Sequence, residues 1–228
     1  MAEQIVRSGT EGLDGLFAIG GFLPRSSVLV SGEPGAGKSI LAMQFIYNGA
    51  REYGESGVYV TSEQNIEKVR SIAKNLGMDF EPLEKKGLIT LMKVPVARGY
   101  EMVPEDLVKL AKKPNIKRMV IDSITPFQYV AVDVRDFRVK LLALIETLTK
   151  ENITLLVTAE KMRTDFDNTR FNAEDFLFDG LILMGRMHRA ASFERVLSVI
   201  KMRGTAHSNE MHPIEISGKG LAVKTLTE

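Results

Sequence analysis

The chain has 228 residues, with 30 lysine and arginine residues against 29 aspartate and glutamate residues, and a formal net charge of +1. This balance gives no global case for a nucleic-acid or acidic-membrane partner. The sequence contains no cysteine, which excludes disulfides, thiolate metal sites and cysteine nucleophiles and agrees with a cytoplasmic location. It shows neither an apolar signal segment nor a run of membrane-spanning length, so we expect no membrane partner and one α/β domain over residues 1–228.

Strand-like and helix-like stretches alternate along the chain, as they do in parallel βαβ units. The expected parallel strands are Val28–Ser31, Val58–Ser62, Leu88–Met92, Arg118–Asp122 and Thr154–Thr158. The expected helices between them are Ile40–Tyr53, Ile66–Leu76, Pro104–Lys112 and Arg135–Lys150. After Phe176 the extended runs Gly180–Met184, Arg195–Met202 and Pro213–Ile216 indicate antiparallel strands. The predicted fold is therefore a mostly parallel twisted sheet flanked by helices, with antiparallel strands added at its C-terminal end.

Residues 32–39 read GEPGAGKS and match every position of the phosphate-binding pattern GxxxxGK[ST]. Three glycines allow the backbone to turn its N–H groups inward around phosphate oxygens. Lys38 is expected to bind the β and γ phosphates, and Ser39 to offer its hydroxyl to Mg²⁺. The required context is present, because an apolar strand precedes the loop and a helix follows it. The predicted nucleotide-binding residues here are Gly32, Glu33, Pro34, Gly35, Ala36, Gly37, Lys38, Ser39 and Ile40.

Two carboxylates follow predicted strands of the same sheet. Asp122 ends the apolar run RMVID, and ligands of open α/β sheets bind beyond the carboxyl ends of the strands, so we expect Asp122 to help Ser39 hold Mg²⁺. Glu63 follows the strand predicted at Val58–Ser62 and is a candidate to orient or deprotonate the attacking water. On spacing alone, Glu63 fits equally well as a residue in the first turn of the next helix.

The segments GEPGAGKS, VTSEQ, RMVIDSIT, LLVTAE and KMRGTAHS occur in the order and approximate spacing of a KaiC-type domain. The chain thus resembles this branch of the RecA-like ATPases from residues 12–16 to the strands after Pro213. The resemblance implies a RecA-like P-loop fold, ATP and Mg²⁺ as ligands, and a homo-oligomeric ring, expected to be a hexamer. It also implies that Glu63 is the catalytic member of a glutamate pair whose second position is Gln64 here, so that hydrolysis is expected to be slow. Glu160 matches a position near the nucleotide.

In the same family, a K-x-R element on the terminal strands reaches the γ phosphate bound by the neighbouring subunit. This resemblance assigns that role to Lys201 and Arg203, so the catalytic residues it implies are Glu63, Lys38, Lys201 and Arg203. An arginine finger neutralises charge in the transition state. From the residues alone, Lys201 and Arg203 flanking Met202 indicate simply a strand with one solvated face. The resemblance also implies that Thr205 and His207 border the base and ribose, with Ser217 on the same side. The further nucleotide-binding residues it implies are Lys201, Met202, Arg203, Thr205, His207 and Ser217.

Two alternatives remain open on the sequence. Lys161, Arg163 and Arg170 lie in the loop after Glu160, where RecA-like recombinases place a DNA-contacting segment, but acidic residues interrupt the positive charge. A DNA recombination or repair ATPase is therefore less favoured than a regulatory or signalling ATPase. Gln64 keeps open a scaffold that binds ATP with negligible turnover and recruits a protein partner.

A further basic cluster lies around a predicted helix end and strand start, where we expect cations to be solvated at the surface. Its members are Lys109, Lys112, Lys113, Lys117 and Arg118.

Overall fold

A mixed β-sheet forms the centre of the computed structural model, which describes residues 4–97, 102, 105–113, 115–162, 164, 166, 171–189 and 192–224. Its strands are β1 (Ser27–Gly32), β2 (Ser56–Thr61), β3 (Ile89–Lys93), β4 (Ile116–Asp122), β5 (Thr154–Glu160), β6 (Gly180–Arg189), β7 (Ser192–Met202), β8 (Met211–Ser217) and β9 (Gly220–Val223). Within the described residues the nine strands follow the order β3-β2-β4-β5-β1-β6-β7-β8-β9. The pairs from β3 to β6 are parallel and the pairs from β6 to β9 antiparallel.

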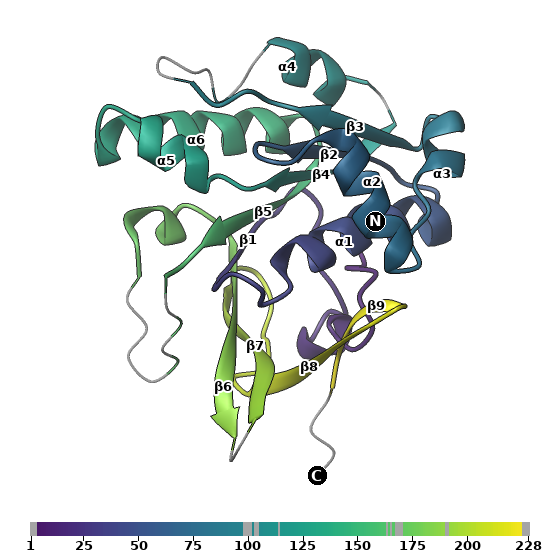
Figure 1. Ribbon diagram of the computed structural model, residues 1–228. Helices are drawn as coiled ribbons and strands as arrows, with labels where there is room; N and C mark the ends of the chain where they lie inside the picture. The colour runs from purple at the N-terminus through teal and green to yellow at the C-terminus, as the bar shows by residue number, and fades with distance from the viewer. Residues whose placement is uncertain are drawn as a thin grey trace.

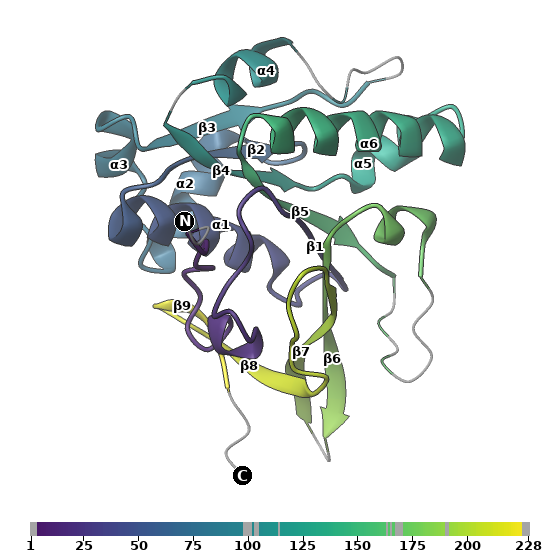
Figure 2. The same ribbon diagram turned by 180° about the vertical axis from the view of Figure 1, so that it is seen from behind.

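Helices cover both faces of the parallel part of the sheet (Figures 1 and 2). They are α1 (Lys38–Tyr53), α2 (Ile66–Asn75), α3 (Glu81–Lys85), α4 (Glu105–Ala111), α5 (Thr125–Val130) and α6 (Val134–Lys150), with short 3₁₀ turns η1 (Asp14–Leu16) and η2 (Ala173–Phe176). The N-terminal segment and α1 to α3 pack on one face, and α4 to α6 pack on the other. In the described part of the chain, no helix combines the length and the apolar character needed to cross a membrane.

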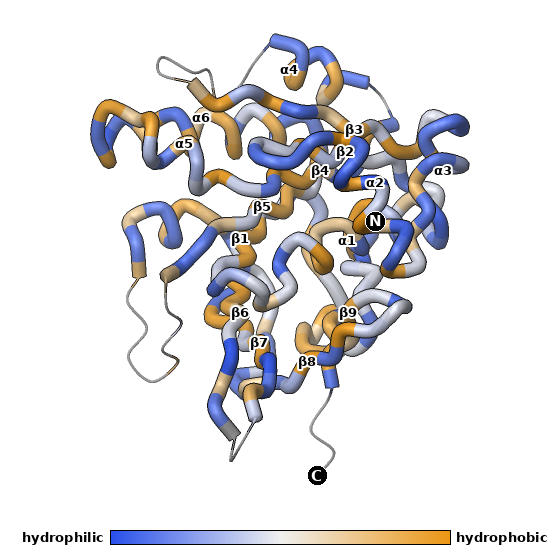
Figure 3. Tube along the Cα trace, viewed as in Figure 1, coloured by the Kyte–Doolittle hydropathy of each residue, from blue (hydrophilic) through white to orange (hydrophobic). Residues whose placement is uncertain are grey.

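The alternating pleat of the central strands builds two hydrophobic layers. On β1, Val28 and Val30 belong to the layer under α1, whereas Leu29 belongs to the layer under α6. Because both faces are covered, the central residues of the inner parallel strands are mostly apolar, as Figure 3 shows for the middle of the sheet. The sheet therefore presents its polar groups at the strand ends, where ligands bind in this architecture.

The predicted α/β class with a C-terminal antiparallel extension is confirmed. Three described elements were not predicted from the sequence, namely α3, α5 and β9. Helices α3 and α5 have five and six residues and carry a proline in the first turn, so they are too short to show a helical period. Strand β9 has four residues, too few to show an alternating pattern, and it is identified by its antiparallel pairing with β8.

The expectation of a solvated basic cluster is wrong for Arg118, whose side chain has no exposed surface. Its guanidinium donates to the carboxylate of Glu55 at 2.6 Å, and to the carbonyl oxygens of Arg7 at 2.6 Å and Phe45 at 3.1 Å. It also lies over the Phe45 ring, with Cζ 4.7 Å from the ring centroid. The residue thus fastens the N-terminal segment to α1 and to the start of β2.

Candidate active site

The glycine-rich loop leaves the end of β1 and enters α1 in a conformation that needs glycine. A Cβ on Gly32 would lie 1.9 Å from the carbonyl oxygen of Met184 on β6. Gly37, which precedes α1, has φ 109°, a backbone conformation that side chains disfavour. The loop therefore ends at a helix N-terminus whose N–H groups have no partner within the helix, which is a ready anion site.

Lys38 points back across the loop. Its ammonium donates to the carbonyl oxygens of Gly32 at 2.8 Å and Glu33 at 2.9 Å, and the residue is only 8% exposed. Burial lowers the pKa of Lys38, while the negative charges of Glu160 and then Asp122 act in the opposite direction. The loop thus already holds one desolvated cation at the place where phosphate oxygens would collect.

Asp122, at the end of β4, receives hydrogen bonds from three hydroxyl groups. Its Oδ1 accepts from Ser39 Oγ at 3.2 Å and from Thr158 on β5, and its Oδ2 accepts from Tyr59 Oη at 2.5 Å. Burial, followed by the charge of Asp122, raises the pKa of Tyr59 well above its ordinary value, so this hydroxyl remains a donor. The Ser39 hydroxyl and the Asp122 carboxylate are hard oxygen ligands held side by side, and they fit Mg²⁺.

These groups open into one cavity of about 410 Å³. Besides the loop it contains Glu63 and Gln64 after β2, and Glu160 at the end of β5. Glu63 Oε2 accepts from Ser123 Oγ at 3.4 Å, and the buried Gln64 Oε1 has no hydrogen-bond donor within the described residues. The lining residues are Pro34, Gly35, Gly37, Lys38, Ser39, Ile40, Glu63, Gln64, Asp122, Ser123, Glu160, Arg195 and Ile216.

Sequence reasoning missed Arg195 as a site residue. From β7 its Nε donates to the carbonyl oxygen of Gly35 at 3.0 Å, so a second cation borders the phosphate loop. It also missed the role of Glu33 in bracing the loop, where the carboxylate accepts from the backbone N–H of Thr164 at 2.8 Å and lies 3.5 Å from Arg186. No local motif distinguishes these arginines from ordinary solvated strand residues, because their contacts depend on how β6 and β7 return past the loop.

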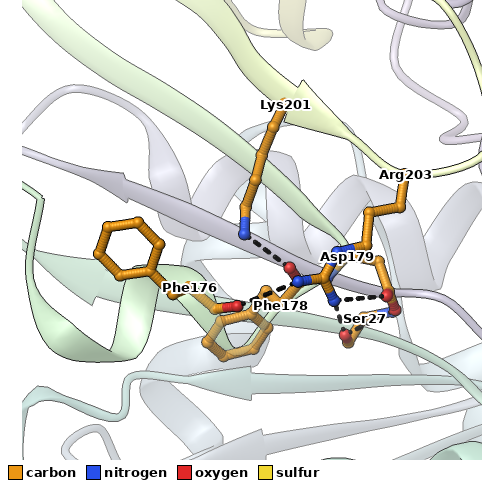
Figure 4. Close-up of polar contacts among 6 residues, drawn as sticks. All are labelled: Ser27, Phe176, Phe178, Asp179, Lys201 and Arg203. Carbon is orange, nitrogen blue, oxygen red and sulfur yellow. Dashed lines mark hydrogen bonds and ion pairs between the residues drawn. The ribbon is translucent and has the colours of Figure 1, made fainter.

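The fold does not bring the K-x-R element to the cavity of its own chain. Lys201 Nζ donates to the carbonyl oxygen of Phe178 at 2.7 Å, and Arg203 Nη2 donates to that of Phe176 at 3.3 Å (Figure 4). Met202 is buried in the core beneath them. The action of Lys201 and Arg203 on a neighbouring subunit stays a prediction.

The residues implied for the base and ribose also lie outside this cavity. The Thr205 hydroxyl donates to the carbonyl oxygen of the adjacent Ala206. The backbone of His207 forms an isolated antiparallel β-bridge with that of Phe17. Ser217 lines a second cavity, of about 500 Å³, between the N-terminal segment, α1 and β8–β9. Their contact with a nucleotide stays a prediction.

The loop after β5 offers little free positive charge in its described part. Lys161 Nζ lies 3.2 Å from the carboxylate of Asp175, and the two side chains are 9% and 3% exposed. Phe171 packs edge-on against Phe176, with ring centroids 6.1 Å apart. The remaining basic candidates of this loop, Arg163 and Arg170, lie outside the described residues.

Known proteins resemble this chain both in sequence and in fold. A family model described as "ATPase: KaiC" matches residues 6–228. The circadian clock oscillator protein KaiC of Synechococcus elongatus is 30% identical over 96% of this chain and 44% of its own length, and that of Parathermosynechococcus lividus is 29% identical over 95% and 42%. The chain therefore spans less than half the length of these relatives. The crystal structure of a KaiC-like protein from Pyrococcus horikoshii OT3 superposes with a TM-score of 0.84 at 34% identity, covering 97% of this chain and 99% of that one.

Proposed function

The chain belongs to the KaiC family of ATPases, and on that premise we propose that it is a cytoplasmic, Mg²⁺-dependent ATPase with a regulatory or signalling role. We propose further that it assembles as a homo-oligomeric ring, expected to be a hexamer, with active sites shared between subunits. Because Gln64 replaces the second carboxylate of the family pair, turnover is expected to be slow.

One observation supports the shared site above the others. Lys38, the Ser39–Asp122 pair and Glu63 border a single cavity. The K-x-R element lies outside it, with the Arg203 side chain 61% exposed. A chain that builds most of a phosphoryl-transfer site and holds two more cations outside its cavity is suited to complete the site of a neighbour.

The residues would divide the work as follows. Lys38 and the loop N–H groups would bind the phosphates, and Ser39 with Asp122 would hold Mg²⁺, which neutralises phosphate charge when bound. Glu63 would orient the attacking water, a role worth roughly 10²- to 10⁴-fold in rate for a positioned base. Arg203 of the adjacent subunit, with Lys201, would stabilise the transition state, where such fingers supply roughly 10³- to 10⁵-fold.

A mixing experiment tests the sharing directly. We expect Lys38→Ala and Arg203→Ala rings each to lose ATP hydrolysis, and a one-to-one mixture to regain it. In the mixture, the Arg203→Ala subunits keep an intact phosphate loop and the Lys38→Ala subunits keep an intact Arg203. If the subunits assemble at random, about a quarter of the head-to-tail interfaces combine the two intact parts, because each interface takes its two subunits independently. Lys38→Ala mixed with the Lys38→Ala/Arg203→Ala double variant repairs no interface and is the matched control. Absence of regained activity after verified subunit exchange would refute the shared site.

A nucleotide-gated scaffold is the second candidate, and Gln64 in the cavity wall favours it. An amide accepts or donates hydrogen bonds but cannot take a proton from water at neutral pH. Light scattering with and without Mg-ATP separates the two functions. Nucleotide-dependent assembly with negligible phosphate release would support the scaffold, and assembly with Lys38-dependent turnover would support the ATPase.

A DNA-dependent ATPase has less support, because Lys161 is buried in an ion pair. Stimulation of hydrolysis by single-stranded DNA, together with salt-sensitive DNA binding, would reinstate it.

A further inference from the structure

Both cations of the K-x-R element contact one short segment, residues 176–179, which runs from the last residue of η2 to the start of β6. Figure 4 shows the side chains of Lys201 and Arg203 converging on this segment from the end of β7 and the turn after it. Asp179 Oδ1 lies 3.4 Å from Arg203 Nη1, and the carbonyl oxygen of Asp179 accepts from the Arg203 backbone N–H at 3.0 Å. Asp179 therefore holds both the main chain and the side chain of Arg203.

The other carboxylate oxygen of Asp179 is committed to the first residue of β1. Asp179 Oδ2 accepts from the backbone N–H and from the hydroxyl of Ser27, each at 2.9 Å. The Asp179 N–H donates in return to the carbonyl oxygen of Ser27 at 2.9 Å. Because Ser27 begins β1, an inner strand of the sheet that leads into the phosphate loop, Asp179 is anchored to the sheet by contacts that do not involve Arg203.

The arrangement allows Asp179 to orient the Arg203 side chain without burying it. Asp179 is partly exposed at 33%, and Arg203 is 61% exposed, so the guanidinium stays open to solvent while Asp179 engages its Nη1 and the carbonyl oxygen of Phe176 engages its Nη2. The charges around Lys201 agree with this role of Asp179. Burial and then the positive charge of Arg203 lower the pKa of Lys201, whereas the negative charges of Asp175 and Asp179 raise it. The negative charges of Asp175 and Asp179 thus counter the repulsion between the two cations.

We propose that Asp179 is a positioning residue that presents Arg203 to the γ phosphate of the neighbouring subunit from a platform fixed to Ser27. The inference rests on the shared-site function proposed above and adds the residue that aims the finger. A planar guanidinium held by two fixed acceptors, here Asp179 and the carbonyl oxygen of Phe176, keeps its remaining donors in a defined direction. Catalysis is sensitive to such aim, since a displacement of about 1 Å can cost on the order of 10²-fold in rate.

The test is a double-mutant cycle between Asp179→Asn and Arg203→Ala, read as steady-state ATP hydrolysis. Asparagine keeps an oxygen for the two Ser27 donors and loses the charge that faces Arg203. We expect Asp179→Asn to lower kcat about tenfold, with the KM for ATP unchanged, because the aim of a group that acts only on the transition state is disturbed. In the Arg203→Ala background the same change should cost nothing further.

Matched variants and a binding measurement guard against a purely structural effect. Glu105→Gln removes an equally simple surface ion pair, with Lys109 on α4 at 2.8 Å, and should leave kcat unchanged. Fluorescent-nucleotide binding and ring mass should be those of the wild type for Asp179→Asn. Asp179→Glu, which retains the charge, should recover part of the lost rate.

Each outcome has one meaning. An unchanged kcat in Asp179→Asn, or an equal loss in both backgrounds, would overturn the positioning role while leaving the shared site intact. If Asp179→Asn fails to fold, Ser27→Ala, which keeps the carboxylate and removes one of its donors, carries the same cycle. Unchanged activity in Arg203→Ala itself would instead refute the finger, and the positioning role with it.

Discussion

The fully buried Arg118 gives the sharpest stability prediction. Its guanidinium donates to Glu55, to the carbonyl oxygen of Arg7 and to that of Phe45. Its Nη2 lies 2.5 Å from the same Glu55 oxygen as an ion pair, without making a second hydrogen bond there. Replacement by alanine removes every one of these contacts and leaves a carboxylate, 19% exposed, facing the resulting cavity.

The expected loss in the free energy of unfolding comes mainly from the Glu55 carboxylate, which remains without its partner. Removing one partner of a buried ion pair costs about 3–5 kcal/mol, because the other charge stays desolvated. For a chain of this size each kcal/mol lowers the melting temperature by roughly 2–4 °C, so we expect Arg118→Ala to melt about 6–20 °C below the wild type. Urea denaturation followed by circular dichroism measures the free energy directly, and the slope m should be unchanged.

A second variant separates the unpaired charge of Glu55 from the hydrogen bonds that Arg118 makes to backbone carbonyl oxygens. Arg118→Met with Glu55→Gln removes both charges and keeps most of the volume, so it should recover most of the stability lost in Arg118→Ala. A loss below about 1 kcal/mol for Arg118→Ala, the size expected for an exposed pair, would refute the reasoning. So would a double variant as unstable as Arg118→Ala, because the lost hydrogen bonds to the Arg7 and Phe45 carbonyl oxygens, rather than the unpaired charge, would then account for the cost.

Three further outcomes are expected. Tyr59→Phe removes a donor to the buried carboxylate of Asp122 and should lower the free energy of unfolding by about 1.5–3 kcal/mol, measured in urea. Burial lowers the pKa of Lys38, so the wild type should gain stability as pH rises through that folded-state pKa toward the unfolded value. Lys38→Met lacks this gain; parallel pH profiles for the two proteins would contradict the reasoning. Gly32→Ala would place a Cβ 1.9 Å from the Met184 carbonyl oxygen, so we expect a loss of about 1–3 kcal/mol and no fluorescent-nucleotide binding; wild-type affinity would disprove the steric argument.

The phosphate loop was predictable because its chemistry is local. Phosphate binding needs a glycine-rich turn, a lysine and a helix N-terminus in direct succession, and residues 32–39 contain all three. Asp122 was predictable for a related reason, since parallel topology brings strand ends to one edge of the sheet. The cavity of about 410 Å³ then contains both, together with Glu63.

The parts that depend on distant contacts were not predictable. Nothing around Arg118 distinguishes it from its solvated neighbour Lys117, because its partners Glu55 and Arg7 come from other parts of the chain. Arg195 reaches the loop only because β7 runs antiparallel to β6 and returns past it. A periodic pattern reports which face of a strand is buried, but it does not report which distant carbonyl or carboxylate a long side chain will meet.

The C-terminal strands determine where the residues of the proposed shared site lie. A Cβ on Gly37 would lie 3.0 Å from Leu221 and 3.2 Å from Ile216, so β8 and β9 pack directly beneath the start of α1. Gln44 fixes them there, since its side chain exchanges hydrogen bonds with the backbone of Leu221 at 2.8 and 3.0 Å. In the same antiparallel extension, β7 ends beside residues 176–179. Lys201 and Arg203 there donate to the carbonyl oxygens of Phe178 and Phe176, outside the cavity. Supporting the phosphate loop from below and sending the two cations to the opposite side are thus consequences of one topology, and this topology favours a site completed by a second copy of the chain.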